Sequence, residues 1–236
     1  MGYPAGMPTH PQVDVPPGHF FTGQATHLLF LAALLPGPLL LAAPSLGDGA
    51  FLGLSDTAWL ALAVGVPVVH QLMVALLWRA QLCHRLLTRL LGEWDLVVWG
   101  ALFLPLLFAR PLTLIGLGCA DLGSAGLPWV VSLSLGGLLL IPAVYTGHSI
   151  HRYFGIPRAL GGDHFRETYR QMPIVREGAF AWSSNAMYTL AFLGLWAIAL
   201  LTGSRAALAA CLFEHAYIWV HWYCTEEPDI RVLYPA

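Results

Sequence analysis

Two adjacent carboxylates end an aromatic, apolar run near the C-terminus. The stretch WVHWYCTEEPDI, residues 219–230, places Glu226 and Glu227 directly before Pro228, which indicates that the helix stops there. Acidic side chains at the C-terminus of a helix oppose the helix dipole. A solvated helix end remains the ordinary alternative, but this mismatch favours a role in binding a cationic ligand.

Two more ionisable residues lie deeper in the same run. Glu214 and His221 follow the three-to-four spacing of one helix face, with Tyr217 or Ile218 between them. Ionisable side chains inside a membrane helix are candidates for function. We therefore treat Glu214 and His221 as candidate catalytic residues, while His221 could equally be a core histidine with a backbone partner.

The composition decides which solvent surrounds these residues. Hydrophobic residues make up 57% of the 236 residues and charged residues only 10%, and the mean hydropathy is +0.66. These values indicate a polytopic membrane protein. The sequence contains no lysine and has a net charge of -2, which argues against a nucleic-acid-binding surface. The four cysteines are scattered singly and are typical of small buried residues.

The apolar runs predict an all-α transmembrane bundle of about six spans. Four runs are long enough to cross a membrane, at 22–43, 58–78, 95–117 and 127–147. Two further runs, at 187–202 and 206–224, are separated only by the tripeptide GSR. They predict a tight C-terminal helical hairpin that forms a cofactor pocket.

The sequence divides into three predicted parts. Residues 1–19 are rich in proline and glycine, lack the features of a signal peptide, and predict a flexible tail. Residues 20–147 predict a four-span scaffold. Residues 148–236 predict the catalytic region, because they hold the longest polar segment, the hairpin and the double glutamate.

Arginine placement predicts the orientation in the membrane. The arginines cluster after the second span and between the fourth and fifth spans, at Arg79, Arg85, Arg89, Arg152, Arg158, Arg166, Arg170 and Arg176. Basic loops stay on the cytoplasmic side. We expect a protein of the bacterial inner membrane with both termini and the active site at the cytoplasmic face.

The block REGAFAWSSNAMY, residues 176–188, resembles the first motif of integral-membrane methyltransferases, the family of isoprenylcysteine carboxyl methyltransferase and phosphatidylethanolamine N-methyltransferase. In that family a glycine-containing turn precedes Arg-His-Pro or Asn-Pro and a tyrosine, and a helical hairpin then leads to a Glu-Glu pair. Here the matching positions are Gly178, Phe180, Asn185, Tyr188, and the pair Glu226 and Glu227. One departure is Ala186, which stands where proline is usual.

This resemblance implies an S-adenosylmethionine-dependent enzyme. Gly178, Phe180, Tyr188, Glu226 and Glu227 would bind the cofactor, and Asn185 would join Glu214 and His221 as a catalytic residue. Carboxylates and aromatic rings also suit a sulfonium on physical grounds. Tyr188, Trp219, Trp222 or Tyr223 could supply the rings.

The asparagine resembles the phospholipid branch and implies phosphatidylethanolamine or a methylated derivative as the membrane-lipid acceptor. An isoprenylcysteine or thiol acceptor is the alternative. Basic residues that could hold a lipid phosphate or simply face the interface are His148, His151, Arg152, Arg176 and Arg231. Arg231 could instead pair with Glu227.

Ten histidines raise the alternative of a di-iron oxygenase. His148 and His151 form an HxxH pair, but no HxxHH cluster occurs. His215 and His221 are about 9 Å apart along a helix, which is poor spacing for one metal ion. We therefore expect no metal ligands.

Overall fold

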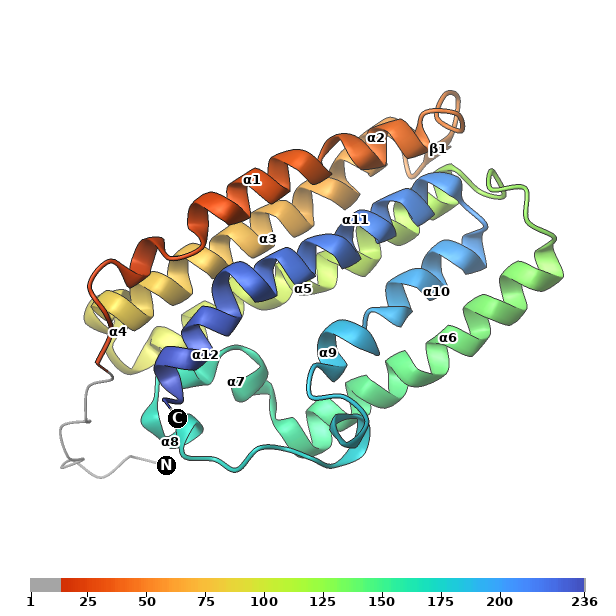
Figure 1. Cartoon of the computed structure of the whole chain (residues 1–236). Coiled ribbons are helices and arrows are strands. Elements are labelled where there is room, and N and C mark those ends of the chain that lie inside the picture. The colour runs from red at the N-terminus through yellow and green to blue at the C-terminus, as the bar shows by residue number, and fades with distance from the viewer. Residues whose placement is uncertain (1–13, 236) are drawn as a thin grey trace.

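The computed structural model describes residues 14–235, so the N-terminal part of the predicted tail, residues 1–13, lies outside the described residues. Residues 14–235 are mostly helical, with one two-stranded antiparallel hairpin (Figure 1). In chain order the elements are η1 (His19–Phe21), α1 (Gln24–Leu34), α2 (Pro36–Ala42), β1 (Ala50–Phe51), β2 (Leu54–Ser55), α3 (Asp56–His84), α4 (Leu86–Leu91), η2 (Gly92–Trp94), α5 (Asp95–Ala120), α6 (Trp129–Ser149), η3 (Ile150–Phe154), α7 (Ile156–Ala159), η4 (Gly162–His164), α8 (Glu167–Arg170), η5 (Gly178–Ala181), α9 (Ala186–Thr189), α10 (Leu193–Thr202), α11 (Arg205–His221), η6 (Trp222–Glu226) and α12 (Glu227–Leu233).

Four helical segments of the described chain are long and apolar enough to cross a membrane. They are His19–Ala42, Asp56–His84, Leu86–Ala120 and Trp129–Phe154. The four long apolar helices predicted from the sequence are therefore present, and their boundaries differ from the predicted ones by up to nine residues. The total of six stays a prediction, because α10 and α11 are only 10 and 17 residues long.

The predicted helical hairpin is present, and its turn explains why it is tight. Gly203 ends α10 in a left-handed conformation with φ 57°, a backbone state that glycine adopts without strain. Ser204 then caps α11, where its hydroxyl accepts a hydrogen bond from the Ala207 amide at 2.9 Å. Asp121, at the end of α5, accepts from the Ser204 hydroxyl at 2.7 Å and from the Ala206 amide at 2.8 Å. The α5 terminus thereby holds the start of the last long helix.

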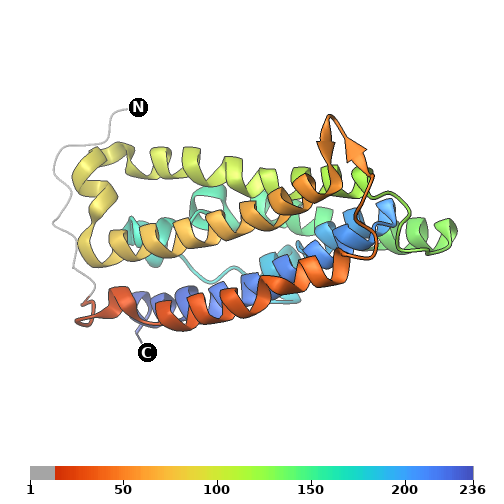
Figure 2. The ribbon, with the colours of Figure 1, turned by 90° about the horizontal axis from the view of Figure 1, so that it is seen from above.

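Helix α11 is the centre of the bundle. It contacts α1, α2, α3, α5 and α10, whereas α6 lies at the edge and packs mainly on α10 (Figures 1 and 2). Small residues allow this close packing. Ala206, Ala207 and Ala210 are fully buried, and a side chain at Gly118 would collide with Thr202 of α10.

The two ends of the bundle differ. Helices α4, α7, α8 and α12 gather at one end, whereas the β1–β2 hairpin and the α10–α11 turn lie at the other (Figure 1). Residues 150–186 run across the first end and return the chain to α9 and α10. The arginine-rich segments and the C-terminal helix therefore share one end, as the orientation prediction requires.

Candidate active site

Glu226 sits at the end of a wide helical turn. Helix α11 ends at His221, and the next five residues, Trp222–Glu226, form a π-helical turn before α12 begins. At 1.5 Å per residue, Glu226 lies about 30 Å along the chain from the start of α11, which matches the thickness of the hydrocarbon core. Its carboxylate is buried in the protein, about one membrane thickness from the start of α11.

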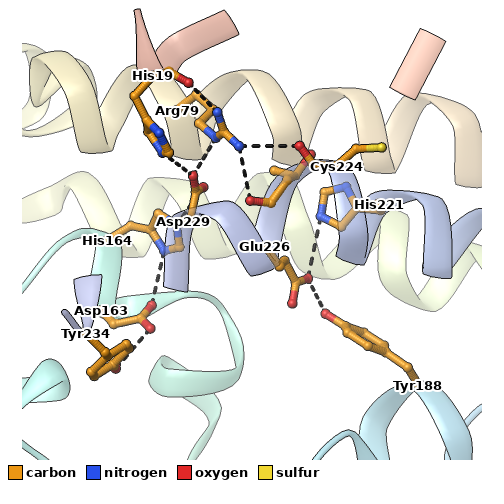
Figure 3. A network of polar contacts seen from close by, with 11 residues as sticks. His19, Arg79, Asp163, His164, Tyr188, His221, Cys224, Glu226, Asp229 and Tyr234 are labelled. Atoms are coloured by element: carbon orange, nitrogen blue, oxygen red, sulfur yellow. Dashed lines mark hydrogen bonds and ion pairs between the residues drawn. The ribbon is translucent and has the colours of Figure 1, made fainter. Parts of the chain in front are cut away.

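The Glu226 carboxylate has two neighbours inside the protein. It accepts a hydrogen bond from the Tyr188 hydroxyl, and its Oε1 lies 3.5 Å from Nε2 of His221 (Figure 3). Burial raises the pKa of Glu226 to about 7, against the opposing effects of the Tyr188 hydrogen bond and the nearby His164 charge. The carboxyl can therefore gain or lose a proton near neutral pH.

Aromatic rings surround the Tyr188 side of this group. The Tyr188 ring meets Trp222, Trp219 and Phe192 edge-on, with centroid distances of 5.9, 6.3 and 6.4 Å. The structure thus brings Tyr188, Glu226 and His221, predicted as site residues, into one cluster. We call these three residues the carboxylate cluster.

His221 completes the cluster from inside the bundle. Its side chain is fully buried, and neither ring nitrogen has a hydrogen-bond partner within the described residues. The rings of His27 and Trp78 lie at centroid distances of 5.9 and 6.2 Å. A buried imidazole without a hydrogen-bond partner is open to a ligand.

Glu227 has different surroundings from Glu226. Its Oε1 accepts from the Arg231 guanidinium at 2.7 Å, one helical turn along α12. Both side chains reach solvent, with exposed fractions of 35% for Glu227 and 74% for Arg231. The predicted pair is thus one buried carboxylate and one surface ion pair, and Arg231 takes the predicted alternative of pairing with Glu227.

The first motif packs against the end of α6. A side chain at Gly178, where φ is +61°, would collide with Ser149, and the Ala179 amide donates to the Ser149 hydroxyl at 3.0 Å. Phe180 is buried and stacks on Phe154 at a centroid distance of 4.9 Å. These contacts fix the segment that leads into α9 and place Tyr188 against Glu226.

Asn185 precedes α9 without capping it through its side chain. Its backbone carbonyl accepts from the Thr189 hydroxyl at 3.0 Å, and its side chain is half-buried. Asn185 lies three residues before Tyr188 and directly precedes the short helix that carries this member of the carboxylate cluster.

Glu214 lies apart from the carboxylate cluster. It is fully buried and its Oε2 accepts from Nε of Arg110 at 2.8 Å. The Arg110 guanidinium also lies over the Phe192 ring, 5.0 Å from the centroid. Seven residues of helix, about 10 Å, separate Glu214 from His221. The three predicted catalytic residues therefore do not form one cluster.

Four of the predicted substrate-binding residues are exposed at the arginine-rich end. They are His148, His151, Arg152 and Arg176. Arg152 lies over the Tyr153 ring at 5.9 Å from the centroid. Their exposure fits a contact with lipid headgroups or the interface, and the structure draws none of them into the carboxylate cluster.

A buried ionic network beside the cluster was not predicted. Asp229 is fully buried and contacts Nε of Arg79 at 2.5 Å, Nε2 of His19 at 2.8 Å and Nε2 of His164 at 3.2 Å. Figure 3 shows these side chains converging from four segments of the chain. The available signal was Asp229, which follows Glu226 by three residues and so shares its helical turn, and Arg79, which lies inside an apolar run.

His164 and Asp163 extend the network toward Tyr234. Burial disfavours charge on His164, but hydrogen bonds and charges from Asp163 and Asp229 outweigh it and raise its pKa to about 9. Burial likewise opposes charge on Asp163, yet the partners His164 and Tyr234 hold its pKa below the ordinary value. Both groups are thus expected to be charged at neutral pH.

A metal centre has no counterpart in the described part of the chain. Within residues 14–235, no group of three or more histidine, cysteine, aspartate or glutamate side chains is arranged to hold a metal ion. His148 and His151 are exposed, and the Trp196 indole donates to His215 at 2.9 Å. The histidines considered for a di-iron site are therefore dispersed.

Comparison with known proteins gives one match. No curated protein and no solved structure matches the chain. A family model covers residues 131–236, from α6 to the C-terminus, and this segment contains all three residues of the carboxylate cluster. The model is described as phospholipid methyltransferase, and residues 131–236 of this membrane protein are similar to it.

Proposed function

We propose that the protein transfers a methyl group from S-adenosylmethionine to a membrane phospholipid, with phosphatidylethanolamine or its partly methylated derivatives as the acceptor. The main observation that supports this function is the carboxylate cluster. In it buried Glu226 lies between Tyr188 and His221, within the matched residues 131–236. A buried carboxylate beside several aromatic rings is complementary to an organic cation.

The residues present fit this cofactor. A buried carboxylate with two neighbours retains further acceptor capacity, and the rings of Tyr188, Trp219 and Trp222 offer faces and edges beside it. His221 adds two unpartnered nitrogens. Glu226 is the residue that we assign to the cofactor cation, and Glu227 has a surface role with Arg231.

When bound, S-adenosylmethionine supplies an electrophilic methyl group. The protein contributes a dry pocket and the alignment of the acceptor nitrogen, which can lower the barrier by roughly 7–11 kcal/mol. An ammonium headgroup must lose a proton before it can attack. We assign that proton to His221, because a protonated Nε2 would face the Glu226 carboxylate at 3.5 Å.

The orientation follows from the arginine-rich end. Basic residues there include Arg85, Arg89 and Arg152, whereas the opposite end carries Arg205. We propose that the arginine-rich end faces the cytoplasm of a bacterium across its inner membrane. The cofactor would enter there, and exposed His148, His151, Arg152 and Arg176 would lie at the level of lipid phosphates.

Two matched variants test the assignment. Glu226→Gln should weaken S-adenosylmethionine binding about tenfold or more, because a buried charge-assisted contact is lost. Glu227→Gln should change it less than about twofold, because an exposed ion pair contributes little. Calorimetric titration into detergent-solubilised protein measures both, and equal effects would remove the assignment.

Lipid methylation identifies the acceptor. Methyl-labelled cofactor, purified protein and mixed micelles should yield methylated phosphatidylethanolamine, detected by mass spectrometry. Labelling of a prenylcysteine analogue instead would keep the enzyme class and replace the acceptor. Absence of S-adenosylmethionine and S-adenosylhomocysteine binding, with stoichiometric iron in the purified protein, would favour the oxygenase alternative.

A further inference from the structure

Arg79 occupies an unusual position beside the carboxylate cluster. Its side chain is fully buried near the end of α3. Nη2 donates to the backbone carbonyls of Thr225 at 3.2 Å and Cys224 at 3.4 Å, and Nη1 donates to the carbonyl of His19. One guanidinium from the second span therefore holds the backbone of the turn that ends in Glu226 (Figure 3).

The local sequence explains why this turn needs an outside donor. In an α-helix the carbonyl of Cys224 would accept from the amide four residues later. That residue is Pro228, which has no amide hydrogen. The wide turn at Trp222–Glu226 further disturbs the regular pattern. Arg79 supplies the Cys224 carbonyl with a hydrogen bond that the regular α-helical pattern cannot supply, and it also donates to the Thr225 carbonyl.

Asp229 holds Arg79 in place. It follows Glu226 by one turn and contacts Nε of Arg79 at 2.5 Å. His19 Nε2 contacts the same oxygen, Oδ1, at 2.8 Å, and His164 Nε2 contacts the other oxygen, Oδ2, at 3.2 Å. Asp229 thus secures α12 to the guanidinium that also secures the turn, and Glu226 lies between these two attachment points.

The start of α1 packs against the Trp222–Glu226 turn on the side opposite Arg79. Gly23 precedes α1 with φ +77°, and a Cβ there would lie 2.2 Å from the Cys224 carbonyl oxygen. Only glycine permits this approach. Backbone contact on one side and the guanidinium on the other leave the turn little freedom to shift.

We propose that Arg79 and Asp229 are positioning residues for Glu226: they hold the wide turn so that its carboxylate meets Tyr188 and His221, and they thereby set the affinity for a cationic cofactor. This proposal rests on the proposed function. It differs from a purely structural ion pair in one respect, because the effect on cofactor affinity must act through the Glu226 carboxylate.

A double-mutant cycle tests this coupling. Asp229→Asn alone should weaken S-adenosylmethionine binding about tenfold, because Glu226 is no longer held in place. The same change in the E226Q background should cost less than about twofold, since the affected contact is already absent. Calorimetric titration of the four proteins in detergent gives the coupling. Equal losses in both backgrounds would overturn the proposal.

Two further variants keep the cycle interpretable. Arg79→Lys retains a charge but not the planar fork that reaches two carbonyls and Asp229 together. It should show the same coupling if Asp229→Asn fails to fold. Asp95→Asn removes another aspartate–arginine pair, whose oxygen lies 2.6 Å from Arg166 at the same end of the bundle. It should reduce stability without changing cofactor affinity in the folded protein.

Thiol labelling tests the position of the turn without any cofactor. In a variant with Cys83, Cys119 and Cys211 replaced by alanine, buried Cys224 should react with a maleimide about tenfold faster after Asp229→Asn or Arg79→Lys. Asp95→Asn should leave that rate unchanged. Unchanged labelling in both network variants would overturn the proposal. If the network variants label faster but the protein with an intact network binds no S-adenosylmethionine, Arg79 and Asp229 hold the turn and the proposed function is wrong.

Discussion

Glu226 and Glu227 are neighbours in the chain but have different surroundings. Successive helical residues point about 100° apart, so one side chain enters the bundle toward Tyr188 while the other reaches solvent and Arg231. A Glu-Glu pair is thus one ligand-binding candidate and one surface residue in this protein. The chemistry of each carboxylate depends on that difference in burial.

Ionisation of Glu226 gives a pH-dependent affinity. Its pKa of about 7 means that the ionised fraction falls from roughly nine-tenths at pH 8 to roughly one-tenth at pH 6. S-adenosylmethionine binding should weaken about tenfold over that range, because a cation favours the ionised carboxylate. Calorimetric titration at several pH values measures this, and Glu226→Gln serves as the control. An equally steep profile for that variant would contradict the assignment.

Residue identities could be predicted from the sequence better than residue contacts. Glu226 was singled out because a carboxylate at this helix end suits a cationic ligand. His221 was singled out by its depth in an apolar run, and Tyr188 by its place in the methyltransferase motif. Arg79 and Asp229 were not assigned to the site, since 150 positions in the chain separate them and their pairing depends on the folded arrangement. Glu214 was predicted to act with His221. In the structure Glu214 pairs with Arg110 instead, and no sequence pattern linked these two residues.

At the scale of elements, hydropathy predicted the long helices and the tripeptide GSR predicted the hairpin. Length was sufficient for α3, α5 and α6, because a run of apolar residues specifies a membrane helix almost regardless of context. The wide turn at Trp222–Glu226 could not be predicted. It depends on donors from α3 and on the approach of α1, and only tertiary packing brings these together.

The start of α11 offers a stability prediction. Asp121 Oδ2 accepts from the Ala206 amide and from the hydroxyls of Ser204 and Ser124. It therefore acts as a charged cap supplied by another helix. Asp121→Asn should lower the free energy of unfolding by about 1–2 kcal/mol. Thermal unfolding in detergent measures the loss, with exposed Asp48→Asn as the control. Equal behaviour of the two variants would show that the cap contributes nothing.

At the scale of the whole molecule, the arginine-rich end combines surface charge with a buried network. The sequence predicted that these segments share one end, and the structure confirms it. The sequence alone could not show that α3, η1, η4 and α12 meet at this end around Asp229. The composition gives the number of charged residues, whereas only the folded structure shows which of them form ion pairs.

Stability should fall at alkaline pH because of His164. Its pKa of about 9 in the folded protein lies above the ordinary value of 6.5. Its contribution is therefore fully present below pH 6.5 and is lost as pH rises through about 9. The melting temperature in detergent should drop between pH 7.5 and about 9.5, and His164→Gln should flatten that drop. A slope that persists in the variant would place its origin elsewhere.

The contact between His19 and Asp229 spans 210 positions of the chain. During synthesis the first two spans are made long before α12, so Arg79 of the second span reaches the bilayer without its carboxylate partner. An unpaired arginine at that depth is costly. A nascent or truncated chain that lacks residues 222–236 would therefore expose a cation and two unmatched histidines. Helix α12 therefore completes the ion pairing at that end of the bundle, because Asp229 is the carboxylate that contacts Arg79.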